Sequence, residues 1–358
     1  MSLAPVLILA GGTGGHVFPG LAVAAALQAR AVPVVWMGSH SSMESRLVPE
    51  RGITFLAVRI SAFRGKGLVR ALQAPFTLLR ATWGAWRILR SVRPRSAISF
   101  GGYAAGPGGL AAWLLRIPLL VHEQNRIPGL TNRTLAKLAK RVLCGFPDSF
   151  PAAANVRYVG NPVRAEIAAL AEPAQRFAGR AGALQLLVLG GSQGARALNL
   201  LLPRALALLP AAQRPQVRHQ CGASMFEATR AAYATAAVDA QVEPFIADMA
   251  SAYGQADLAV CRAGALTLAE LSAAGLGALL VPFPYAVDDH QTRNGQWLVA
   301  AGAAELRSEA ELTAELLAKL LEKYQTRSAC LELAERARAL ARTGAAEVCA
   351  EQALEVAA

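Results

Sequence analysis

Four short segments combine glycines with side chains that can bind an anion, accept a proton or hydrogen-bond a sugar hydroxyl, and a fifth is polar without glycine. The four are residues 11–20, 100–109, 189–196 and 261–270, the fifth is residues 288–294, and each follows a short apolar run. Glycine after a strand lets the backbone approach a ligand closely, and the start of the next helix offers unpaired N–H groups to an anion. The pattern favours a protein that binds phosphorylated or hydroxylated small molecules.

The first segment places four glycines, Thr13 and His16 between a strand and a helix. Its spacing matches neither the GxGxxG dinucleotide fingerprint nor the GxxxxGK[ST] phosphate loop, so nicotinamide and P-loop chemistry lose support. The near-neutral pKa of an ordinary histidine makes His16 a candidate general base. The alternatives are a tight turn without a ligand and a purely structural histidine.

The second and third segments predict two further anion-binding loops. Residues 100–109 lead from a strand into a helix, and Pro107 fits the first turn of that helix. This loop suits a second phosphorylated substrate, or it is a glycine-rich hinge. In the third segment, backbone N–H groups and the Ser192 hydroxyl are suited to bind a phosphate oxygen.

The last two segments predict contacts to a ribose and to a sugar. Glu270 is placed either to accept hydrogen bonds from a ribose diol or to interact with a helix end. Residues 288–294 are polar and suit sugar hydroxyls, or they form a solvated helix start capped by Asp288 or Asp289. No metal-binding motif is present, so we expect neither a metal ion nor a cofactor.

Short apolar strands alternating with helices must position these segments. The apolar runs are residues 6–10, 32–37, 54–58, 97–100, 118–122, 142–145, 156–159, 184–189, 217–220, 258–261 and 278–282. This alternation predicts an α/β protein with a doubly wound parallel sheet in each half and a boundary near residues 160–162. Ligands of such sheets bind beyond the carboxyl ends of the strands. Two such domains facing one cleft favour an enzyme with two substrates.

Charge divides the chain into two unequal halves. Residues 1–165 hold 20 Lys/Arg and four Asp/Glu, whereas residues 166–358 hold 16 Lys/Arg and 20 Asp/Glu. The basic half predicts an anionic partner, which is a phosphorylated substrate, an acidic membrane or nucleic acid. Nucleic acid is the least favoured of the three, because the chain has no aromatic RNA-binding signature and no recognisable DNA-binding module.

Cysteine spacing and hydropathy limit the setting. The five cysteines are scattered without a CxxC pair, which favours a reduced, cytosolic protein without disulfides or zinc. The apolar N-terminus lacks a basic region and is broken by the glycines of residues 11–15, so we expect no signal peptide. Residues 96–115 are uncharged over the length of a membrane span, but their glycines and Pro107 predict strand, loop and helix instead.

Residues 59–95 predict an amphipathic helix with a strongly basic face. An apolar stripe at three-to-four-residue spacing is interleaved with nine arginines and lysines; it consists of Leu68, Leu72, Phe76, Leu79, Trp83 and Trp86. The stripe either docks on an anionic membrane surface, which we favour, or faces the core while the basic face is solvated.

Seven motifs occur in an order that closely resembles the MurG family, the bacterial N-acetylglucosaminyltransferases of peptidoglycan synthesis. They are GGTGGHVFPGLA, FGGYAAGPGGLAA, HEQN (122–125), GNPVR (160–164), LGGSQGARALN, CRAGALTLAE and HQ (290–291). The resemblance implies the GT-B fold, with two Rossmann-like domains whose parallel sheets face a central cleft. It also implies a hexosyltransferase that moves N-acetylglucosamine, with inversion, from UDP-N-acetylglucosamine to the C4 hydroxyl of undecaprenyl-diphosphoryl-N-acetylmuramoyl-pentapeptide. The alternatives are another GT-B lipid glycosyltransferase and a UDP-N-acetylglucosamine epimerase.

The resemblance also implies roles for individual residues. His16 is the expected base, with Glu123 as runner-up. The expected donor-binding residues are Thr13, Gly14, Gly15, Asn125, Arg164, Ser192, Ile246, Ala265, Leu266, Thr267, Leu268, Ala269, Glu270 and Gln291. The second glycine loop is expected to bind the lipid diphosphate of the acceptor through Gly101, Gly102, Tyr103, Gly106, Gly108 and Gly109. Some relatives have an Asp where this chain has Ser41, so an acidic helper for the base is not expected at that position.

The resemblance finally implies a division of labour between the domains. Residues 1–162 with a C-terminal helix at 343–358 are expected to bind the acceptor and the membrane, and residues 163–342 to bind the nucleotide sugar. The expected location is peripheral, on the cytoplasmic face of the inner membrane. Other proteins of cell-wall synthesis, acting in cell shape and division, are candidate partners.

Overall fold

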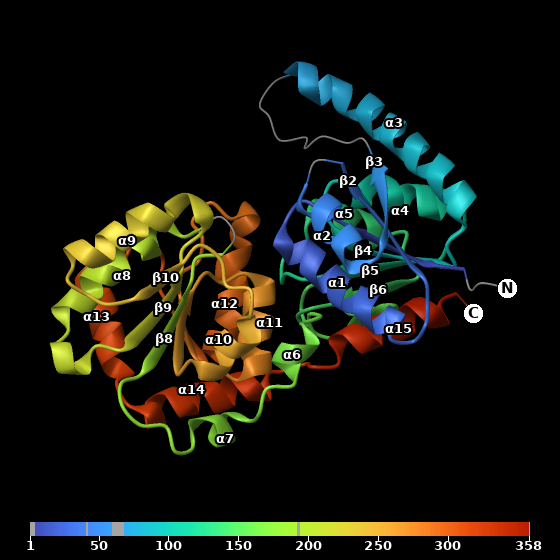
Figure 1. Cartoon of the computed structure of the whole chain (residues 1–358). Coiled ribbons are helices and arrows are strands. Elements are labelled where there is room, and N and C mark those ends of the chain that lie inside the picture. The colour runs from blue at the N-terminus through green and yellow to red at the C-terminus, as the bar shows by residue number, and fades with distance from the viewer. Residues whose placement is uncertain (1–3, 41, 59–67, 192–193, 358) are drawn as a thin grey trace. The chain divides into compact units, whose positions relative to one another are not determined.

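The structure, a computed structural model, describes residues 4–40, 42–58, 68–191 and 194–357. Its contacts divide the chain into two compact units. Unit 1 comprises Met1–Arg164 and Thr343–Ala358, and unit 2 comprises Ala165–Arg342 (Figure 1). The boundary in the chain therefore falls between residues 164 and 165, close to the expected one at 162 and 163, and the C-terminal segment belongs to unit 1.

Unit 1 is built on a seven-stranded parallel sheet with the order β3-β2-β1-β4-β5-β6-β7. Its strands are β1 (Val6–Ala10), β2 (Val34–Ser39), β3 (Thr54–Val58), β4 (Ser96–Gly101), β5 (Leu119–Glu123), β6 (Arg141–Cys144) and β7 (Val156–Tyr158). The chain winds outward from β1 in both directions, as in a Rossmann sheet. The switch point of this sheet therefore lies between β1 and β4, where the first two glycine loops begin.

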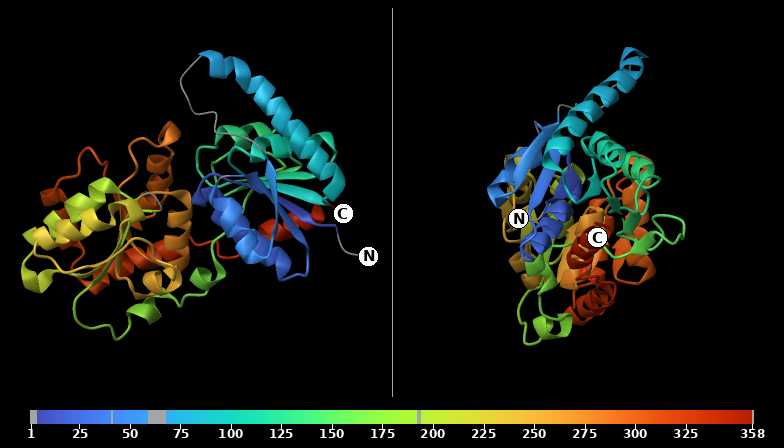
Figure 2. Two further views of the ribbon diagram at one scale, coloured as in Figure 1. Left: turned by 45° about the horizontal axis from the view of Figure 1, so that its top comes forward. Right: turned by 90° about the vertical axis from the view of Figure 1, so that its right-hand side faces the viewer.

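Helices cover both faces of this sheet, so β1 is buried on both sides (Figure 2). Val6, Ile8 and Ala10 pack with helices α1 (Gly14–Gln28) and α15 (Ala345–Glu355). Leu7 and Leu9 point the other way and pack with α3 (Leu68–Val92) and α4 (Ala105–Leu114). Such an uninterrupted apolar strand is typical of a parallel sheet with two covered faces. Two short helices, α2 (Met43–Leu47) and α5 (Leu130–Leu135), complete the unit.

The C-terminal helix α15 is fastened to unit 1 by polar contacts as well as by its apolar face. Ser96 Oγ donates to the carbonyl oxygen of Ala353 at 2.6 Å, and Arg30 forms an ion pair with Glu351 at 2.7 Å. Arg141 forms an ion pair with Glu355 at 2.6 Å. These contacts join residues that lie between 214 and 321 positions apart in the chain.

Unit 2 repeats the same winding with six parallel strands in the order β10-β9-β8-β11-β12-β13. The strands are β8 (Gln185–Leu189), β9 (Gln216–Gln220), β10 (Gln241–Glu243), β11 (Leu258–Cys261), β12 (Ala278–Leu280) and β13 (Ala304–Leu306). The sequence did not predict β10 and β13, because each is a three-residue edge strand without an apolar run. The switch point of this sheet lies between β8 and β11. The third glycine segment follows β8 and the fourth follows β11, so both lie at this switch point.

A large apolar core of unit 2 takes residues from α7 (Pro173–Phe177), α8 (Arg196–Leu208), α9 (Phe226–Thr235), α13 (Ala314–Lys323) and α14 (Arg327–Ala339). The unit also contains α6 (Ala165–Ala168), α10 (Met249–Gln255), α11 (Ala265–Ala274) and α12 (His290–Ala300).

Two sequence-based expectations about membrane segments can be compared with the fold. Residues 96–115 form β4, a loop and α4, as predicted. In the described part of the chain, no helix combines the length and apolarity that a membrane span requires.

The core-facing interpretation of the stripe on α3 is wrong for its described central part. Phe76, Leu79 and Trp83 are 75%, 66% and 61% exposed, whereas a different face of α3 buries Ala81, Ala85 and Leu89. Trp86, the last residue of the stripe, is half-buried and packs against the core of unit 1. The small alanines let α3 pack closely on the sheet, and the other large residues of the stripe are left in solvent. Arg59, Arg64, Lys66 and the side chains of Leu68, Arg70 and Leu72 lie outside the described residues.

Candidate active site

The two glycine loops of unit 1 interlock at the switch point of its sheet. Gly11 N donates to Gly101 O at 3.3 Å, and a methyl group on Gly102 would overlap Gly11 O. Gly12, Gly101 and Gly102 have φ values of 92°, 100° and 93°, which other residues rarely adopt. Glycine is therefore required here both by the backbone conformation and by the close approach of the two loops.

His16 lies in the first turn of α1 with its ring beside Gly101. Its Nδ1 is 3.2 Å from Gly11 O and 3.2 Å from Thr13 Oγ1. Because a carbonyl oxygen can only accept, Nδ1 carries the proton that it donates to Gly11, and Nε2 keeps its lone pair. The ring is half-buried. This geometry suits Nε2 to accept a proton from a bound hydroxyl.

Glu123, the runner-up base, is buried and fully engaged. Its Oε1 accepts from the backbone N and side-chain Nδ2 of Asn125 at 3.0 and 3.2 Å. Its Oε2 accepts from Gly129 N at 3.2 Å and Asn132 Nδ2 at 3.1 Å. Burial raises the pKa of this carboxyl, and the four donors oppose that shift. The arrangement favours Glu123 as an anchor that orients Asn125 rather than as the base.

Asn132 joins this network to the second glycine loop, although no sequence motif pointed to it. Its side chain is buried, accepts a hydrogen bond from Ser99 Oγ at 3.0 Å and donates to His122 O at 3.0 Å. A methyl on Gly101 would come within 3.3 Å of both Asn132 Nδ2 and His16 Nε2. The carboxyl ends of β4 and β5 and the start of α1 therefore converge on one small polar region.

The predicted acceptor loop divides into two parts. Gly101, Gly102 and the exposed Tyr103 lie at the edge of the sheet, and Gly106 is half-buried in the first turn of α4. Gly108 and Gly109 are buried, and an added methyl would overlap Leu9 at the first and Leu135 at the second. Close packing of α4 thus accounts for glycine at these two positions, and an acceptor contact from them stays a prediction.

In unit 2, the third and fourth segments lie at the switch point between β8 and β11. Gly190 N donates to Gln220 O at 2.9 Å, and Gly191 N donates to Gln220 Oε1 at 3.0 Å. These two N–H groups are thus engaged within the protein. Ser192 lies outside the described residues.

Helix α11 begins at Ala265 after its cap residue Gly264 and presents its first turn at the same edge. Ala265, Leu266 and Thr267 contribute the helix start, where backbone N–H groups are not paired within the helix. Leu268 is a different case, because its side chain is fully buried and its N–H donates to Gly264 O at 3.0 Å. Leu268 is therefore not favoured as a contact to the nucleotide sugar. Ala269, the next residue, is half-buried.

Glu270 is buried one turn further along α11 beside a tyrosine of α10. Tyr253 Oη donates to Glu270 Oε2 at 3.0 Å. This contact orients the carboxylate of Glu270 at the edge of the donor segment. Tyr253 carries no motif, and sequence reasoning did not find it.

The remaining predicted donor residues lie on other loops. The Ile246 side chain is buried, so a ligand contact from it would come from the backbone, whereas its neighbour Phe245 is 64% exposed. Gln291 Oε1 accepts from Phe283 N at 2.8 Å, which fixes the orientation of its amide. Arg164 is half-buried and is the last residue of unit 1 before the chain enters unit 2. Thr13 and Gly15 are exposed, and Gly14 is half-buried.

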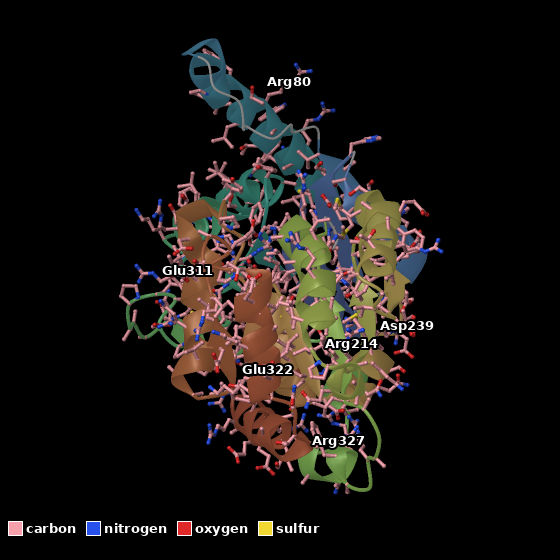
Figure 3. The ribbon with its side chains drawn as sticks, turned by 90° about the vertical axis from the view of Figure 1, so that its left-hand side faces the viewer. Arg80, Arg214, Asp239, Glu311, Glu322 and Arg327 are labelled. Carbon is pink, nitrogen blue, oxygen red and sulfur yellow. The ribbon has the colours of Figure 1, made fainter. Side chains whose placement is uncertain are left out.

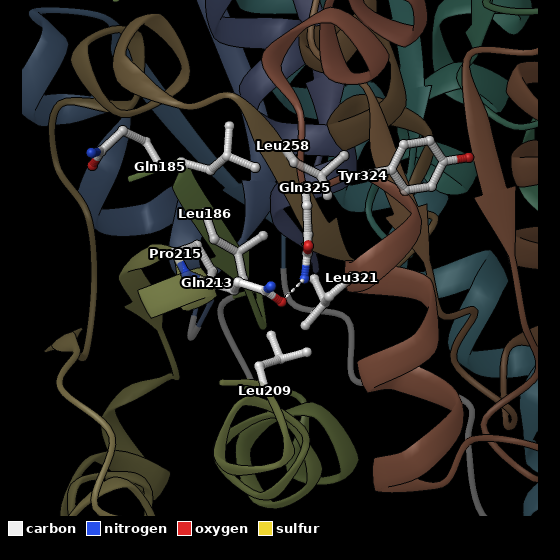
Figure 4. Close-up of a pocket in the computed structure, with 10 residues that line it drawn as sticks. Gln185, Leu186, Leu209, Gln213, Pro215, Leu258, Leu321, Tyr324 and Gln325 are labelled. Carbon is white, nitrogen blue, oxygen red and sulfur yellow. Dashed lines mark hydrogen bonds between the residues drawn. The ribbon is translucent and has the colours of Figure 1, made fainter. Parts of the chain in front are cut away.

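A shallow apolar pocket of unit 2 is unrelated to these loops. It is lined by Leu186, Leu258, Leu321 and neighbouring residues, at the amino ends of β8 and β11 (Figure 4). Among the described residues, no group of histidine, cysteine and acidic side chains is arranged to hold a metal ion. All five cysteines are free and buried.

Two units with Rossmann-like strand order, each with glycine or helix-start loops at the switch point of its sheet, define the class of GT-B glycosyltransferases. The glycosyltransferase family 28 N-terminal domain matches residues 6–144, and the C-terminal domain of the same family matches residues 185–352. A Xylella fastidiosa protein is 56% identical over 353 residues, covering 98% of this chain and 96% of its own. A Marinobacter nauticus protein is 54% identical over 352 residues, covering 98% and 97%.

Both relatives are named UDP-N-acetylglucosamine--N-acetylmuramyl-(pentapeptide) pyrophosphoryl-undecaprenol N-acetylglucosamine transferase. The crystal structure of Acinetobacter baumannii MurG is similar, with a TM-score of 0.84 and 42% identity over 98% of this chain and 99% of that one. The glycosyltransferase of kitacinnamycin, 17% identical with a TM-score of 0.68 over 99% of both chains, shares the fold alone. The chain belongs to the MurG family of glycosyltransferase family 28.

Proposed function

We propose that this enzyme transfers N-acetylglucosamine from UDP-N-acetylglucosamine to the C4 hydroxyl of undecaprenyl-diphosphoryl-N-acetylmuramoyl-pentapeptide, which makes the disaccharide lipid precursor of peptidoglycan. The observation that carries this proposal is the near-complete match, at 54–58% identity, to relatives named for that reaction. The four glycine and helix-start loops at the two switch points support it, because they provide sites for two phosphorylated substrates.

The nucleotide sugar binds mainly to unit 2 in this proposal. Glu270 accepts hydrogen bonds from the ribose diol, and the backbone at Ile246 binds uracil. The diphosphate lies at the start of α11, where the helix dipole favours negative charge. Ser192 and Arg164 contact the same diphosphate, and Gln291 binds the sugar hydroxyls. Thr13, Gly14, Gly15 and Asn125 add contacts from unit 1.

The chemical step is an inverting displacement at the anomeric carbon. His16 Nε2 takes the proton of the acceptor C4 hydroxyl, while the oxygen of that hydroxyl forms the new bond to the anomeric carbon. The bond from that carbon to the diphosphate oxygen breaks, and its electron pair leaves with UDP. The α11 start and Arg164 stabilise the charge that develops on the leaving group. The sugar ring gains oxocarbenium character in the transition state.

The acceptor is a membrane lipid, so unit 1 docks peripherally on the cytoplasmic face of the inner membrane. The exposed stripe of Phe76, Leu79 and Trp83 supports this, because an apolar surface of that kind on a monomer is unusual. Basic residues lie on the same helix, and Arg80 extends from it (Figure 3). Each basic residue near an anionic leaflet contributes about 1 kcal/mol of attraction.

The test is release of UDP from UDP-N-acetylglucosamine with and without the lipid acceptor. We expect release that depends strictly on the muramoyl-pentapeptide lipid. Release without any acceptor would indicate an epimerase, and release with diacylglycerol instead would indicate a different lipid glycosyltransferase. Either of these outcomes would reject the proposal.

A further inference from the structure

Glu44, in the first turn of α2, is a buried acid outside every motif that the sequence presented. Its relative exposure is 0%. Burying a carboxylate is unfavourable unless strong partners compensate. Within the described residues Glu44 forms no ion pair, and both its partners are backbone N–H groups. The burial of the Glu44 carboxylate therefore calls for an explanation, and the backbone groups that it binds provide one.

The carboxylate of Glu44 joins the loop after β1 to the end of β2. Its Oε2 accepts from Gly12 N at 3.2 Å, and its Oε1 accepts from Ser39 N at 3.1 Å. A methyl on Gly11 would overlap Oε1, and a methyl on Gly38 would come within 2.7 Å of Glu44 Cγ. Two glycines therefore leave the space that this side chain occupies.

The same contacts connect Glu44 to His16 through a single residue. Gly11 lies against the Glu44 carboxylate, and its carbonyl oxygen accepts the Nδ1 proton of His16 at 3.2 Å. Gly12, at a φ of 92°, is held by the hydrogen bond to Oε2. Because Gly12 N is engaged in this way, the loop has one N–H fewer to offer an anion, and its conformation is set from within the protein.

We propose that Glu44 is a positioning residue of the transfer reaction: it fixes the Gly11–Gly12 turn and thereby the ring of His16. This inference rests on the proposed function, in which His16 Nε2 accepts the acceptor proton. A displacement of a reacting group by about 1 Å can reduce a rate by about 100-fold. Glu44 thus affects turnover without touching either substrate.

The test compares Glu44→Gln with Glu50→Gln, which changes an exposed acid of the same segment. The amide that Glu44→Gln introduces keeps the shape of the carboxylate but turns an N–H₂ group toward one of the two N–H donors. We expect Glu44→Gln to lower kcat by about tenfold or more, a larger factor than the change in UDP affinity, in a protein that still unfolds cooperatively. The melting temperature should fall as well, because the amide leaves a buried N–H donor without an acceptor. We also expect faster exchange of the Gly12 amide hydrogen. Glu50→Gln should change none of these.

A Glu44→Gln enzyme with kcat within twofold of wild type and an unchanged Gly12 exchange rate overturns the proposal. A fall in kcat that UDP affinity follows by the same factor, with the cooperative unfolding transition lost, also overturns it, because that is a general loss of structure.

Two further measurements keep the outcome decisive. If Glu44→Gln does not fold, Glu44→Asp keeps the charge but shortens the reach, and its kcat and Gly12 exchange rate are expected to change in the same directions. The wild-type transfer assay separates this inference from the proposed function. If wild type transfers nothing to the lipid, the function is wrong, whereas the Gly12 exchange rates still report whether Glu44 holds the loop.

Discussion

The hydroxyl of Tyr253 donates to Glu270 Oε2 at 3.0 Å, and both side chains are buried at the carboxyl edge of the unit 2 sheet. The contact joins α10 to α11 and holds one carboxylate oxygen in a defined place. A hydrogen bond to a charged group contributes about 1.5–3 kcal/mol, more than a neutral one. The orientation of the proposed ribose ligand is thus set by a residue outside the donor motifs.

Tyr253→Phe should weaken donor binding through the ribose. We expect a dissociation constant for UDP raised roughly tenfold and a smaller preference for UDP over 2′-deoxy-UDP, since the carboxylate loses its orienting partner. Calorimetric titration of both nucleotides measures this. Tyr233→Phe removes another buried hydroxyl, which contacts His219 at 2.9 Å, and should leave the preference unchanged. An unaltered preference in Tyr253→Phe would show that Tyr253 does not act on the ribose.

Glu270→Ala should have a larger effect of the same kind. We expect an increase in the KM for UDP-N-acetylglucosamine that exceeds the effect of Tyr253→Phe, because both the ribose contact and the partner of Tyr253 are lost. Initial rates at saturating lipid acceptor give this KM. If it is unchanged, Glu270 has no place in the ribose site.

His16→Ala should lower kcat by about 100-fold or more, because the proton of the acceptor hydroxyl then has no positioned base. His40→Ala is the matched control, since His40 is exposed on the loop after β2. Turnover of the two variants is compared at saturating donor and acceptor. Near wild-type turnover in His16→Ala would exclude the role of base.

The exposed stripe on α3 should govern membrane association. A triple variant, Phe76→Ser with Leu79→Ser and Trp83→Ser, should lose most of its flotation with anionic vesicles. Leu208→Ser removes a residue of unit 2 that is also exposed, and should float as wild type does. High salt should weaken wild-type flotation because the basic residues act through screened charge. If wild type does not float at low salt, docking through this surface is wrong.

Two buried histidines should make stability fall in mild acid. Burial lowers the pKa of His219 to about 3 and that of His122 to about 4, from 6.5. Between those values and 6.5 the unfolded chain binds protons that the folded one does not, so stability is full above 6.5 and decreases as pH falls. Each histidine should cost about 2 kcal/mol between pH 7 and pH 5.

Urea unfolding at pH 7 and pH 5 tests this pH dependence. His219→Gln should be less stable than wild type at pH 7, because His219 is hydrogen-bonded to Tyr233 and Asn199. It should also lose less stability on going to pH 5, since the titrating group is gone. An equal pH dependence in both proteins would mean that His219 titrates normally in the folded state.

Local sequence sufficed for the strands of both sheets that are apolar throughout. Residues 6–10 form β1, and residues 258–261 form β11, as predicted. A parallel strand buried on both faces must be apolar without interruption, and that signal is visible in a single sequence. The edge strands β10 and β13 were missed because each is short and has a charged glutamate among its three residues, so neither forms an apolar run.

The glycine loops show where local reasoning ends. The sequence predicted that glycines at 11–15 and 101–102 lie where strands end, and β1 ends at Ala10 and β4 at Gly101. It could not distinguish them from Gly108 and Gly109, which have the same local pattern but contact Leu9 and Leu135 in the core. The difference depends on which side of α4 faces the sheet, and residues distant in sequence decide that.

The order of residues alone therefore specifies the alternation of strands and helices, the positions of the ligand loops and the family to which the chain belongs. The packing of the folded chain decides which side chains support those loops. Glu44 reaches Gly12, and Tyr253 reaches Glu270, only because parallel strands bring the ends of separate βα units to one edge. A lone glutamate or tyrosine has no periodicity or motif to mark it, so its role appears only once its partners, 32 and 17 residues away, are in place.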